Sequence, residues 1–460
     1  MSLLRGSRPI LADPIQSPSV TLVRTPARVL LTVYLVMLLL VPSRFIIGPL
    51  GSAGTLAGVL GVGLLCWYWI AWLSPRSQVV QERQPLRMML GFVLFAVLAG
   101  YAAAMTRHML GAERNAADVA LINIASWLGI ALMAADSLSS LHDLEAIRRR
   151  MVNCGVVVAA VGILQFFTGF DIVQYLNLPG LTLNGAYASV GARDGFNRPT
   201  STALHAIEFG VVMATLLPLA LHGARHAPKG RAAWRWAGVF VIASGMMMSV
   251  SRSAVLGGVI TLLMLLPSWS KKERQITYAV LVVFLGLMHV VAGGLIGTLK
   301  NLVLSIGTDS STVARTDDYG DALGFFVQSP WFGRGLGTFL PQLYRVFDNH
   351  YLVFLVEVGL VGTVAFVGLF FTGFALTARA RRHTADPARR HLARAFGAAM
   401  LVLIFSYGTF DALAFSMVAG LTFLVLGCCA AVWRLLRQEA RDGLDDPVDV
   451  GVRHARVDGQ

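Results

Sequence analysis

Between residues 271 and 298 the chain reads KKERQITYAVLVVFLGLMHVVAGGLIGT. Three basic residues lie in the first four positions, and residues 276–298 contain no Asp, Glu, Lys or Arg. An apolar run of this length spans the hydrocarbon core of a bilayer as one α-helix. Only helices and closed barrels satisfy their backbone groups in lipid. Because the run is rich in Leu and Val and does not alternate between polar and apolar residues, it predicts a transmembrane helix and not a barrel strand.

Similar runs recur along the chain, which has 460 residues and is 56% apolar and only 14% charged. This composition indicates an integral membrane protein and not a large soluble core. We predict an all-α, polytopic membrane protein with about twelve transmembrane helices and a large outer loop between helices nine and ten. The predicted spans are 28–43, 52–73, 87–105, 118–135, 151–168, 203–222, 234–250, 253–268, 276–298, 350–378, 392–412 and 416–434.

The predicted organisation follows directly from these spans. Residues 1–27 form an N-terminal tail, 28–298 hold helices one to nine, and 299–349 form the large outer loop. Residues 350–434 then hold helices ten to twelve, and 435–460 form a C-terminal tail.

Basic residues determine the predicted orientation. They lie in both predicted tails and in every second loop, which the positive-inside rule places in the cytoplasm. The net charge of +13 therefore reflects topology and lipid contact. Nucleic-acid binding is the rival explanation of strong basicity, but the charges are spread over loops and not gathered on one face, so we expect no nucleic-acid partner. The basic loops contain Arg76/Arg83/Arg87, Arg148–Arg150, Arg225/Lys229/Arg231/Arg235, Lys271/Lys272/Arg274 and Arg379–Arg394.

Several classes of site and of protein are not indicated. The cysteines Cys66, Cys154, Cys428 and Cys429 all fall within predicted spans, so they predict neither a disulfide framework nor a metal site. The phosphate-binding pattern GxxxxGK[ST] does not occur, which argues against an ATP-driven pump. We predict no metal and no cofactor.

A few arginines fall on the predicted outer side, where the positive-inside bias does not explain them. Arg198 lies in FNRPTS, just before the sixth span, and Arg252 lies in SVSRS at the tip of a helical hairpin. A guanidinium presents its donors in a fork that matches phosphate oxygens, so two arginines from different hairpins would clamp a pyrophosphate. Alternatively, each arginine only snorkels to lipid headgroups or caps a helix C-terminus.

Candidate bases lie in the sequence DNHY, at the start of the tenth span. Either Asp348 or His350 could deprotonate a hydroxyl. Alternatively, Asp348 is the N-cap of the span and His350 is an interfacial polar residue. Glu357 lies seven residues after His350, on nearly the same helical face, and an intramembrane carboxylate is either functional or paired with a polar neighbour.

Other polar residues receive less weight. Glu208 and Asp411 are weaker candidates of the same kind as Glu357. We interpret His108, His205 and Asp118 as structural.

The large outer loop carries two further signals. The sequence from Arg315 to Phe326 predicts a short amphipathic helix at the interface. Arg334 then lies between glycines in GRGLG, residues 333–337. This run resembles a phosphate-binding loop, although a short glycine-rich run is more often a turn.

Taken together, these motifs resemble the signature region of the O-antigen ligase and polymerase superfamily, bacterial membrane glycosyltransferases that handle polyprenyl-linked glycans. The resemblance lies in residues 315–362, with SVSRS and Arg198 matching upstream motifs in the same order. The family's ligases commonly read His-Asn-x-Tyr-Leu at the start of this span. Here Asp348 takes the position of that histidine and His350 the variable one, which is more similar to the polymerase-like branch.

The resemblance implies metal-independent glycosyl transfer on the outer face of the bacterial cytoplasmic membrane; the positive-inside rule places both termini in the cytoplasm. The donor would be an oligosaccharide linked through pyrophosphate to a polyprenyl lipid. Arg198 and Arg252 would bind the pyrophosphate, and Asp348 or His350 would deprotonate the acceptor hydroxyl. The implied substrate-binding residues are Arg315, Arg334, Gly335, Gly337, Asn349, Tyr351 and Glu357.

The resemblance also implies membrane lipid as a partner, and suggests a chain-length regulator or export machinery. Polymerisation of repeat units into a surface polysaccharide is favoured because of Asp348. An O-antigen-type ligase is the first alternative. A flippase or transporter of the same lipid-linked glycan, and a scaffold of a secretion complex, are alternatives from other classes.

Overall fold

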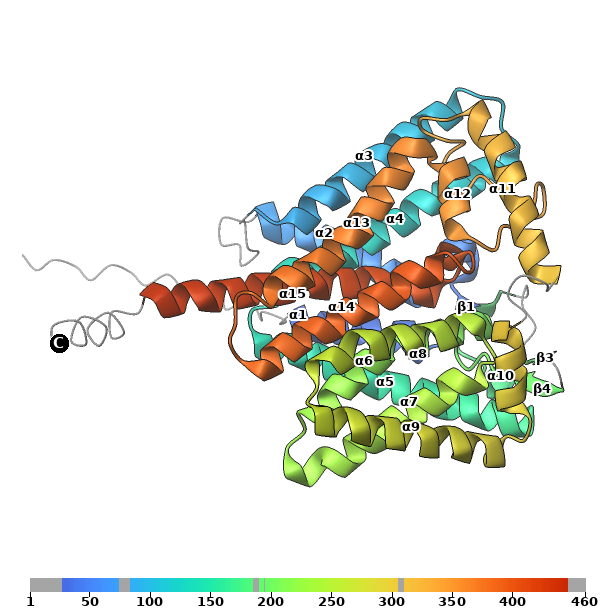
Figure 1. Ribbon diagram of the computed structural model, residues 1–460. Coiled ribbons are helices and arrows are strands. Elements are labelled where there is room, and N and C mark those ends of the chain that lie inside the picture. Colours follow the sequence, from blue (N-terminus) through green and yellow to red (C-terminus); the bar gives the residue numbers. More distant parts are fainter. Residues whose placement is uncertain (1–26, 74–82, 185–189, 194, 305–309, 446–460) are drawn as a thin grey trace, which may run out of the picture.

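The computed structural model describes residues 27–73, 83–184, 190–193, 195–304 and 310–445, which are mostly helical (Figure 1). The prediction of an all-α protein is confirmed. The helices are α1 (Ala27–Leu39), α2 (Leu56–Leu73), α3 (Pro85–Met105), α4 (Gly111–Ser137), α5 (Leu141–Thr168), α6 (Ala206–Arg225), α7 (Ala232–Met248), α8 (Arg252–Leu265), α9 (Lys271–Val291), α10 (Leu295–Leu304), α11 (Ser310–Gln328), α12 (His350–Glu357), α13 (Gly359–Ala380), α14 (Pro387–Tyr407) and α15 (Ser416–Asp445).

Extended structure in the described residues is limited to two short antiparallel pairs. Strand β1 (Phe45–Ile46) pairs with β2 (Thr182–Leu183), and β3 (Gly191–Arg193) pairs with β4 (Phe196–Arg198). Short 3₁₀ turns connect the helices at η1 (Gly48–Ala53), η2 (Ile172–Tyr175), η3 (Lys229–Arg231), η4 (Leu266–Ser268) and η5 (Ala412–Ala414).

Eight helices of the described chain are long and apolar enough to cross a membrane: α2, α3, α4, α5, α6, α9, α13 and α15. Two shorter apolar helices cover Ala27–Leu39 and Arg252–Ser268. Each of the twelve predicted spans is occupied by a helix, and the number of membrane crossings stays a prediction.

The helices form two groups with a central layer between them (Figure 1). One group contains α2, α3, α4, α11, α12 and α13, and the other contains α5 to α10; α1, α14 and α15 lie between them. The central helix α15 is 94% buried over its apolar window. Small residues allow this close packing, because a Cβ on Gly427 would lie 2.6 Å from the carbonyl oxygen of Ala131.

Predicted span ten is two helices and not one. Helix α12 ends at Glu357 and α13 begins at Gly359, whose φ of +62° breaks the helical path. The outer loop satisfies the backbone groups that the break exposes, since Leu360 N donates to Pro330 O at 2.8 Å and Val361 N donates to Trp331 O at 3.1 Å. Non-helical backbone at membrane depth is tolerated where protein covers it in this way.

Two helices extend across predicted boundaries, and the boundaries themselves stay predictions. Helix α10 (Leu295–Leu304) runs across the predicted start of the outer loop at residue 299, and α15 continues to Asp445, eleven residues into the predicted C-terminal tail. The amphipathic helix predicted in the loop is present within α11. Residues 1–26 and 446–460 of the predicted tails lie outside the described residues.

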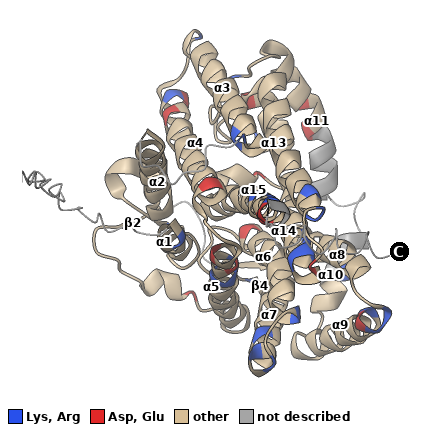
Figure 2. Cartoon of the chain, turned by 90° about the vertical axis from the view of Figure 1, so that its left-hand side faces the viewer, with Lys and Arg blue, Asp and Glu red and all other residues tan. Residues whose placement is uncertain are grey.

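Charged residues occupy isolated bands on an otherwise uncharged chain (Figure 2). Figure 2 views the molecule from the end at which α15 finishes, and Lys and Arg mark helix ends there. We call this the basic end; the sequence predicts that it faces the cytoplasm. The strands and the start of α12 lie at the opposite end (Figure 1), which we call the strand end.

Candidate active site

Arg198 is the last residue of β4 and is fixed by contacts of the two residues before it. The ring of Phe196 stacks on Phe166, with centroids 5.8 Å apart. The side-chain amide of Asn197 donates to Phe166 O at 3.0 Å. The hairpin is therefore attached to the end of α5, and Arg198 is held at the strand end.

Arg252 is the first residue of α8, in the turn between α7 and α8. Val250, two residues earlier, is fully buried and has a φ of +47°. Such a conformation is an outlier for a β-branched residue, and backbone strain of this kind gathers at functional sites. The hydroxyl of Ser253 then donates to Thr409 Oγ1 at 2.7 Å, which attaches the start of α8 to the turn after α14.

Arg198 also has a strained neighbour, because Ser201 has a φ of +53°. The surrounding polar groups hold Ser201 in place: its N–H donates to Gln165 Oε1 at 2.6 Å and its hydroxyl donates to Val158 O at 2.7 Å. Both predicted phosphate-binding arginines therefore lie within three residues of a non-glycine residue with positive φ.

His205 lies near both Arg198 and Asp348, since the charge of each acts on its ring. Its Nδ1 accepts from Ile207 N at 3.1 Å, so its side chain caps α6. Burial lowers the pKa of His205, Arg198 lowers that pKa further, and Asp348 raises it. The charges of Arg198 and Asp348 thus act on one imidazole, which places the two predicted site residues in one neighbourhood.

His350 forms a pair with Asp411. Its Nδ1 lies 2.5 Å from Asp411 Oδ1, and only 3% of its side chain is exposed. Its other ring nitrogen, Nε2, is buried and has no hydrogen-bond partner among the described residues. A carboxylate on one imidazole nitrogen orients the ring and leaves the other nitrogen for a substrate.

A cavity of about 410 Å³ opens beside this pair. It lies between α1, α2, α4, α12, η5 and residues 336–347, and His350, Glu357 and Asp411 contribute to its wall. The rest of the wall mixes aromatic rings with amides, including Tyr34, Asn123, Trp127, Phe339, Gln342 and Phe347.

The start of α12 resolves one alternative for Asp348. The N-cap is Asn349, whose side chain accepts from Tyr351 N at 3.0 Å, and not Asp348. Asp348 is exposed, and its N–H donates to the carboxylate of Asp318. Asn349 and Tyr351 were predicted to bind substrate, but the structure gives them structural contacts, since the Tyr351 hydroxyl donates to Ile404 O at 2.6 Å.

The glycine-rich run is a turn and not a phosphate-binding loop. Gly333, Gly335 and Gly337 all have positive φ. The N–H of Gly335 donates to Glu357 O at 2.8 Å, and the carboxylate of Glu357 accepts from the N–H groups of Gly337 and Phe339. These donors are already used within the protein, so Gly335 and Gly337 offer no anion site and Glu357 holds the turn against α12.

Arg334 is likewise engaged in the fold. Its NH2 donates to the Tyr344 hydroxyl at 2.7 Å and lies 3.4 Å from Glu113 Oε1, and its guanidinium packs over the Tyr344 ring. Arg315 lies in α11, and its side chain is outside the described residues.

The structure also divides the weaker candidates into residues that stabilise the fold and one residue of the candidate site. Glu208 is completely buried and accepts from the N–H groups of Leu204, Met417 and Val418, so it caps the start of α15. Asp118 accepts from the Tyr101 hydroxyl at 2.7 Å. Asp411, in contrast, belongs to the site.

The geometry described above coincides with a sequence match. Residues 237–367 match the family model described as O-antigen ligase. The match supports the resemblance to the O-antigen ligase and polymerase superfamily, and with it a membrane enzyme of that general type. No curated protein matches the chain significantly.

The O-antigen ligase match covers part of the site. It contains Arg252, Asp348 and His350, while Arg198, His205 and Asp411 lie outside it. The sequence predicts a structural role for His205, which looks isolated there, and gives Asp411 little weight; Asp411 is 61 residues from its partner His350. The signal that could have raised Asp411 is its position at a predicted span end on the same side as His350.

Proposed function

We propose that this protein is a membrane glycosyltransferase that polymerises lipid-linked oligosaccharide repeat units on the outer face of the cytoplasmic membrane. The observation that carries the proposal is the convergence of Arg198, His205 and Asp348 at the strand end, which also holds the His350–Asp411 pair. The O-antigen ligase match, which includes Asp348 and His350, supports the same chemistry. Polymerisation is favoured because Asp348 takes the position of the ligase histidine.

The donor is an oligosaccharide attached through pyrophosphate to a polyprenyl lipid. Arg198 and Arg252 bind the pyrophosphate oxygens, and their positive charge stabilises the leaving group without a metal ion. The acceptor hydroxyl oxygen attacks the anomeric carbon, the bond from that carbon to the pyrophosphate oxygen breaks, and the pyrophosphate keeps the electron pair.

The proton of the acceptor hydroxyl passes to a base, and the chain offers two. Asp348 is the candidate that the motif favours, and it is exposed and acts on the same imidazole, His205, as Arg198 does. His350 is the candidate that the cavity favours, because its Nε2 lacks a hydrogen-bond partner in the described chain and Asp411 orients the ring. Asp348→Asn and His350→Gln distinguish them, since only the loss of the base abolishes transfer while pyrophosphate binding persists.

The acceptor sugar occupies the 410 Å³ cavity. Aromatic faces and amides are the groups with which proteins hold sugars, because rings cover apolar sugar faces and amides satisfy hydroxyls. The lipid tail remains among membrane lipids beside the helices. A chain-length regulator or export machinery is a further partner under this proposal.

A ligase is the second candidate function, and the O-antigen ligase description of the matching family favours it. A ligase would use the same donor and the same arginines, but would transfer the finished glycan to a lipid or protein acceptor. A flippase or transporter of the same glycan is the alternative from another class, and it would need no paired imidazole and carboxylate.

The size distribution of surface glycan tests the proposal. A strain from which the gene for this protein is deleted is complemented with the wild-type protein, with Arg252→Ala or with Asp348→Ala. Single repeat units on the normal acceptor with loss of long chains identify a polymerase. Long chains that stay on the polyprenyl carrier identify a ligase. A normal pattern with both variants contradicts the catalytic assignment and favours the transporter.

A further inference from the structure

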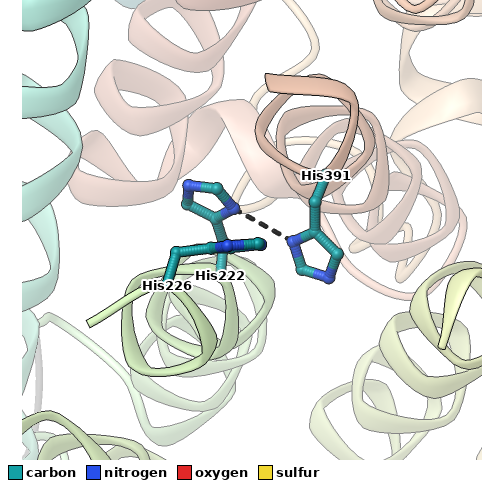
Figure 3. A group of neighbouring side chains, drawn as sticks. All are labelled: His222, His226 and His391. Carbon is teal, nitrogen blue, oxygen red and sulfur yellow. Dashed lines mark hydrogen bonds between the residues drawn. The ribbon is translucent and has the colours of Figure 1, made fainter. Parts of the chain in front are cut away.

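Three histidines meet at the basic end, far along the bundle from the candidate active site. His222 lies in the last turn of α6, His226 is the residue after that helix, and His391 lies in the first turns of α14 (Figure 3). One nitrogen of each ring lies within 4.8 Å of the others. We call this group the histidine cluster.

We propose that the histidine cluster binds one divalent transition-metal ion of the zinc class, which joins the end of α6 to the start of α14. Neutral imidazoles are the usual ligands of such ions, and three histidines with an open fourth position form a common site. This site is independent of the proposed glycosyl transfer.

The spacing of the ring nitrogens suits an ion with little movement. The Nδ1 atoms of His222 and His391 are 3.0 Å apart, and two nitrogens on a tetrahedral zinc ion lie about 3.3 Å apart. The ring of His226 lies beside both others, with its centroid 4.9 Å from that of His222 and 5.2 Å from that of His391.

The exposure of the histidine cluster and the groups around it are also compatible with a bound metal ion. His222 and His391 are buried, whereas His226 is exposed, so an ion can enter from the aqueous side. The outer nitrogen of His222 lies 3.9 Å from a carboxylate oxygen of Glu145, which is beyond hydrogen-bond distance, so a small movement would let Glu145 orient the ring as carboxylates orient metal-binding histidines.

The hydrogen bond from Trp269 to His391 opposes metal binding, and this leads to a specific test of the proposal. Its indole N–H donates to Nε2 of His391 at 2.9 Å, so that nitrogen is an acceptor and Nδ1 of His391 carries the proton. An ion on Nδ1 displaces this proton to Nε2, where it faces the indole N–H. Metal binding therefore requires Trp269 to release His391, and removal of the indole donor increases affinity.

The test is a titration of the purified full-length protein, prepared without a histidine tag, with Co²⁺. Visible absorption of the bound ion reports its coordination, and Zn²⁺ then displaces it. Wild type is expected to bind one Co²⁺ per chain. His226→Gln weakens binding about 10-fold or more, and its exposed position leaves the fold intact. His142→Gln removes an exposed histidine at the same end and leaves binding unchanged.

Trp269→Phe provides the second arm of the test. It is expected to tighten Co²⁺ binding by about 3–10-fold, the equivalent of one hydrogen bond. A purely structural histidine cluster would gain no affinity from the loss of a buried hydrogen bond. The proposal is overturned if wild type and Trp269→Phe both fail to bind Co²⁺, or if His226→Gln binds it as tightly as wild type.

Discussion

At the residue scale, the charge of a residue and its predicted side of the membrane identify most of the candidate site. They do not identify partners that are distant in the sequence. Arg198, Arg252, Asp348 and His350 were identified because a polar residue on the predicted outer side needs an explanation. Asp411 received little weight because it is 61 residues from His350, and no local pattern links a residue at one helix start to a turn after another helix.

The geometry of Arg252 leads to the first prediction. Arg252→Lys keeps the positive charge but loses the planar fork of donors, so a pyrophosphate clamp fails. We expect polymer formation to fall about 100-fold, measured as long-chain glycan in a complemented deletion strain. Arg389→Lys, at an exposed arginine of the basic end, is the matched control. Normal polymer with Arg252→Lys would mean that Arg252 only anchors lipid headgroups.

The pairing of His350 with Asp411 leads to the second prediction. Asp411→Asn keeps the size of the side chain but removes the carboxylate that orients the ring and stabilises its protonated form. We expect transfer to fall about 10-fold or more and His350→Gln to lower it about 100-fold or more, with purified protein and a lipid-linked donor. The double variant should lose no more than His350→Gln alone. Additive losses would show that the two residues act separately.

His205 carries the third prediction, which concerns pH. Burial and Arg198 lower its pKa in the folded protein, so the unfolded chain binds a proton more readily than the folded one. Stability from this group is present above pH 6.5 and is lost as the pH falls below it. Protonation also removes the acceptor on Nδ1 that caps α6.

We therefore expect the thermal midpoint to fall between about pH 7.5 and about pH 5.5, with His205 contributing to the fall. His205→Asn keeps a capping side chain but cannot titrate, so its midpoint should change less over the same range. His142→Gln should keep the wild-type slope. Identical slopes in wild type and His205→Asn would exclude His205 as the titrating group.

At the element scale, apolar length predicted where helices lie but not where one of them breaks. Residues 350–378 were predicted as one span because nothing in their composition interrupts it. The break at Gly359 depends on the loop that packs against it, since the carbonyls of Pro330 and Trp331 take up the exposed N–H groups. A sequence pattern contains the glycine but not this tertiary partner. The same limit explains why the glycine-rich run was compared with a phosphate loop.

The break leads to the fourth prediction. Gly359 has a φ of +62°, and a Cβ there would lie 2.6 Å from backbone atoms of Trp331 and Gly333. Gly359→Ala costs about 1–2 kcal/mol for the backbone conformation alone, and the contact adds to this cost. We expect the thermal midpoint in detergent to fall by about 2 °C or more.

Gly91→Ala is the matched control for this substitution. Gly91 lies inside α3 with nothing within 4 Å of its added Cβ, so alanine there stabilises the helix by about 0.5–1 kcal/mol. Equal midpoints for the two variants would mean that α12 and α13 can join into a continuous helix.

At the scale of the whole molecule, composition determined the class of fold and left its packing open. A chain that must bury its backbone groups in lipid can only form helices when its apolar runs do not alternate. The central position of α15 could not be predicted. Small residues such as Gly420 and Gly427 permit close packing, but they do not determine which helix packs against them. The basic loops predict orientation. In the described residues Lys and Arg mark helix ends at the basic end (Figure 2), and the side of the membrane that this end faces stays a prediction.

Orientation leads to the fifth prediction, on which the proposed chemistry depends. In a variant with Cys66 replaced by Ser, a cysteine at Gln342 lies at the strand end beside the cavity, and a cysteine at Gly230 lies at the basic end. If the positive-inside rule holds, a membrane-impermeant maleimide labels residue 342 in spheroplasts and labels residue 230 only after lysis. The opposite pattern would put the His350–Asp411 pair in the cytoplasm. Because nucleotide sugars serve as donors in the cytoplasm, the position of the site would then no longer be a reason to infer a polyprenyl-linked donor.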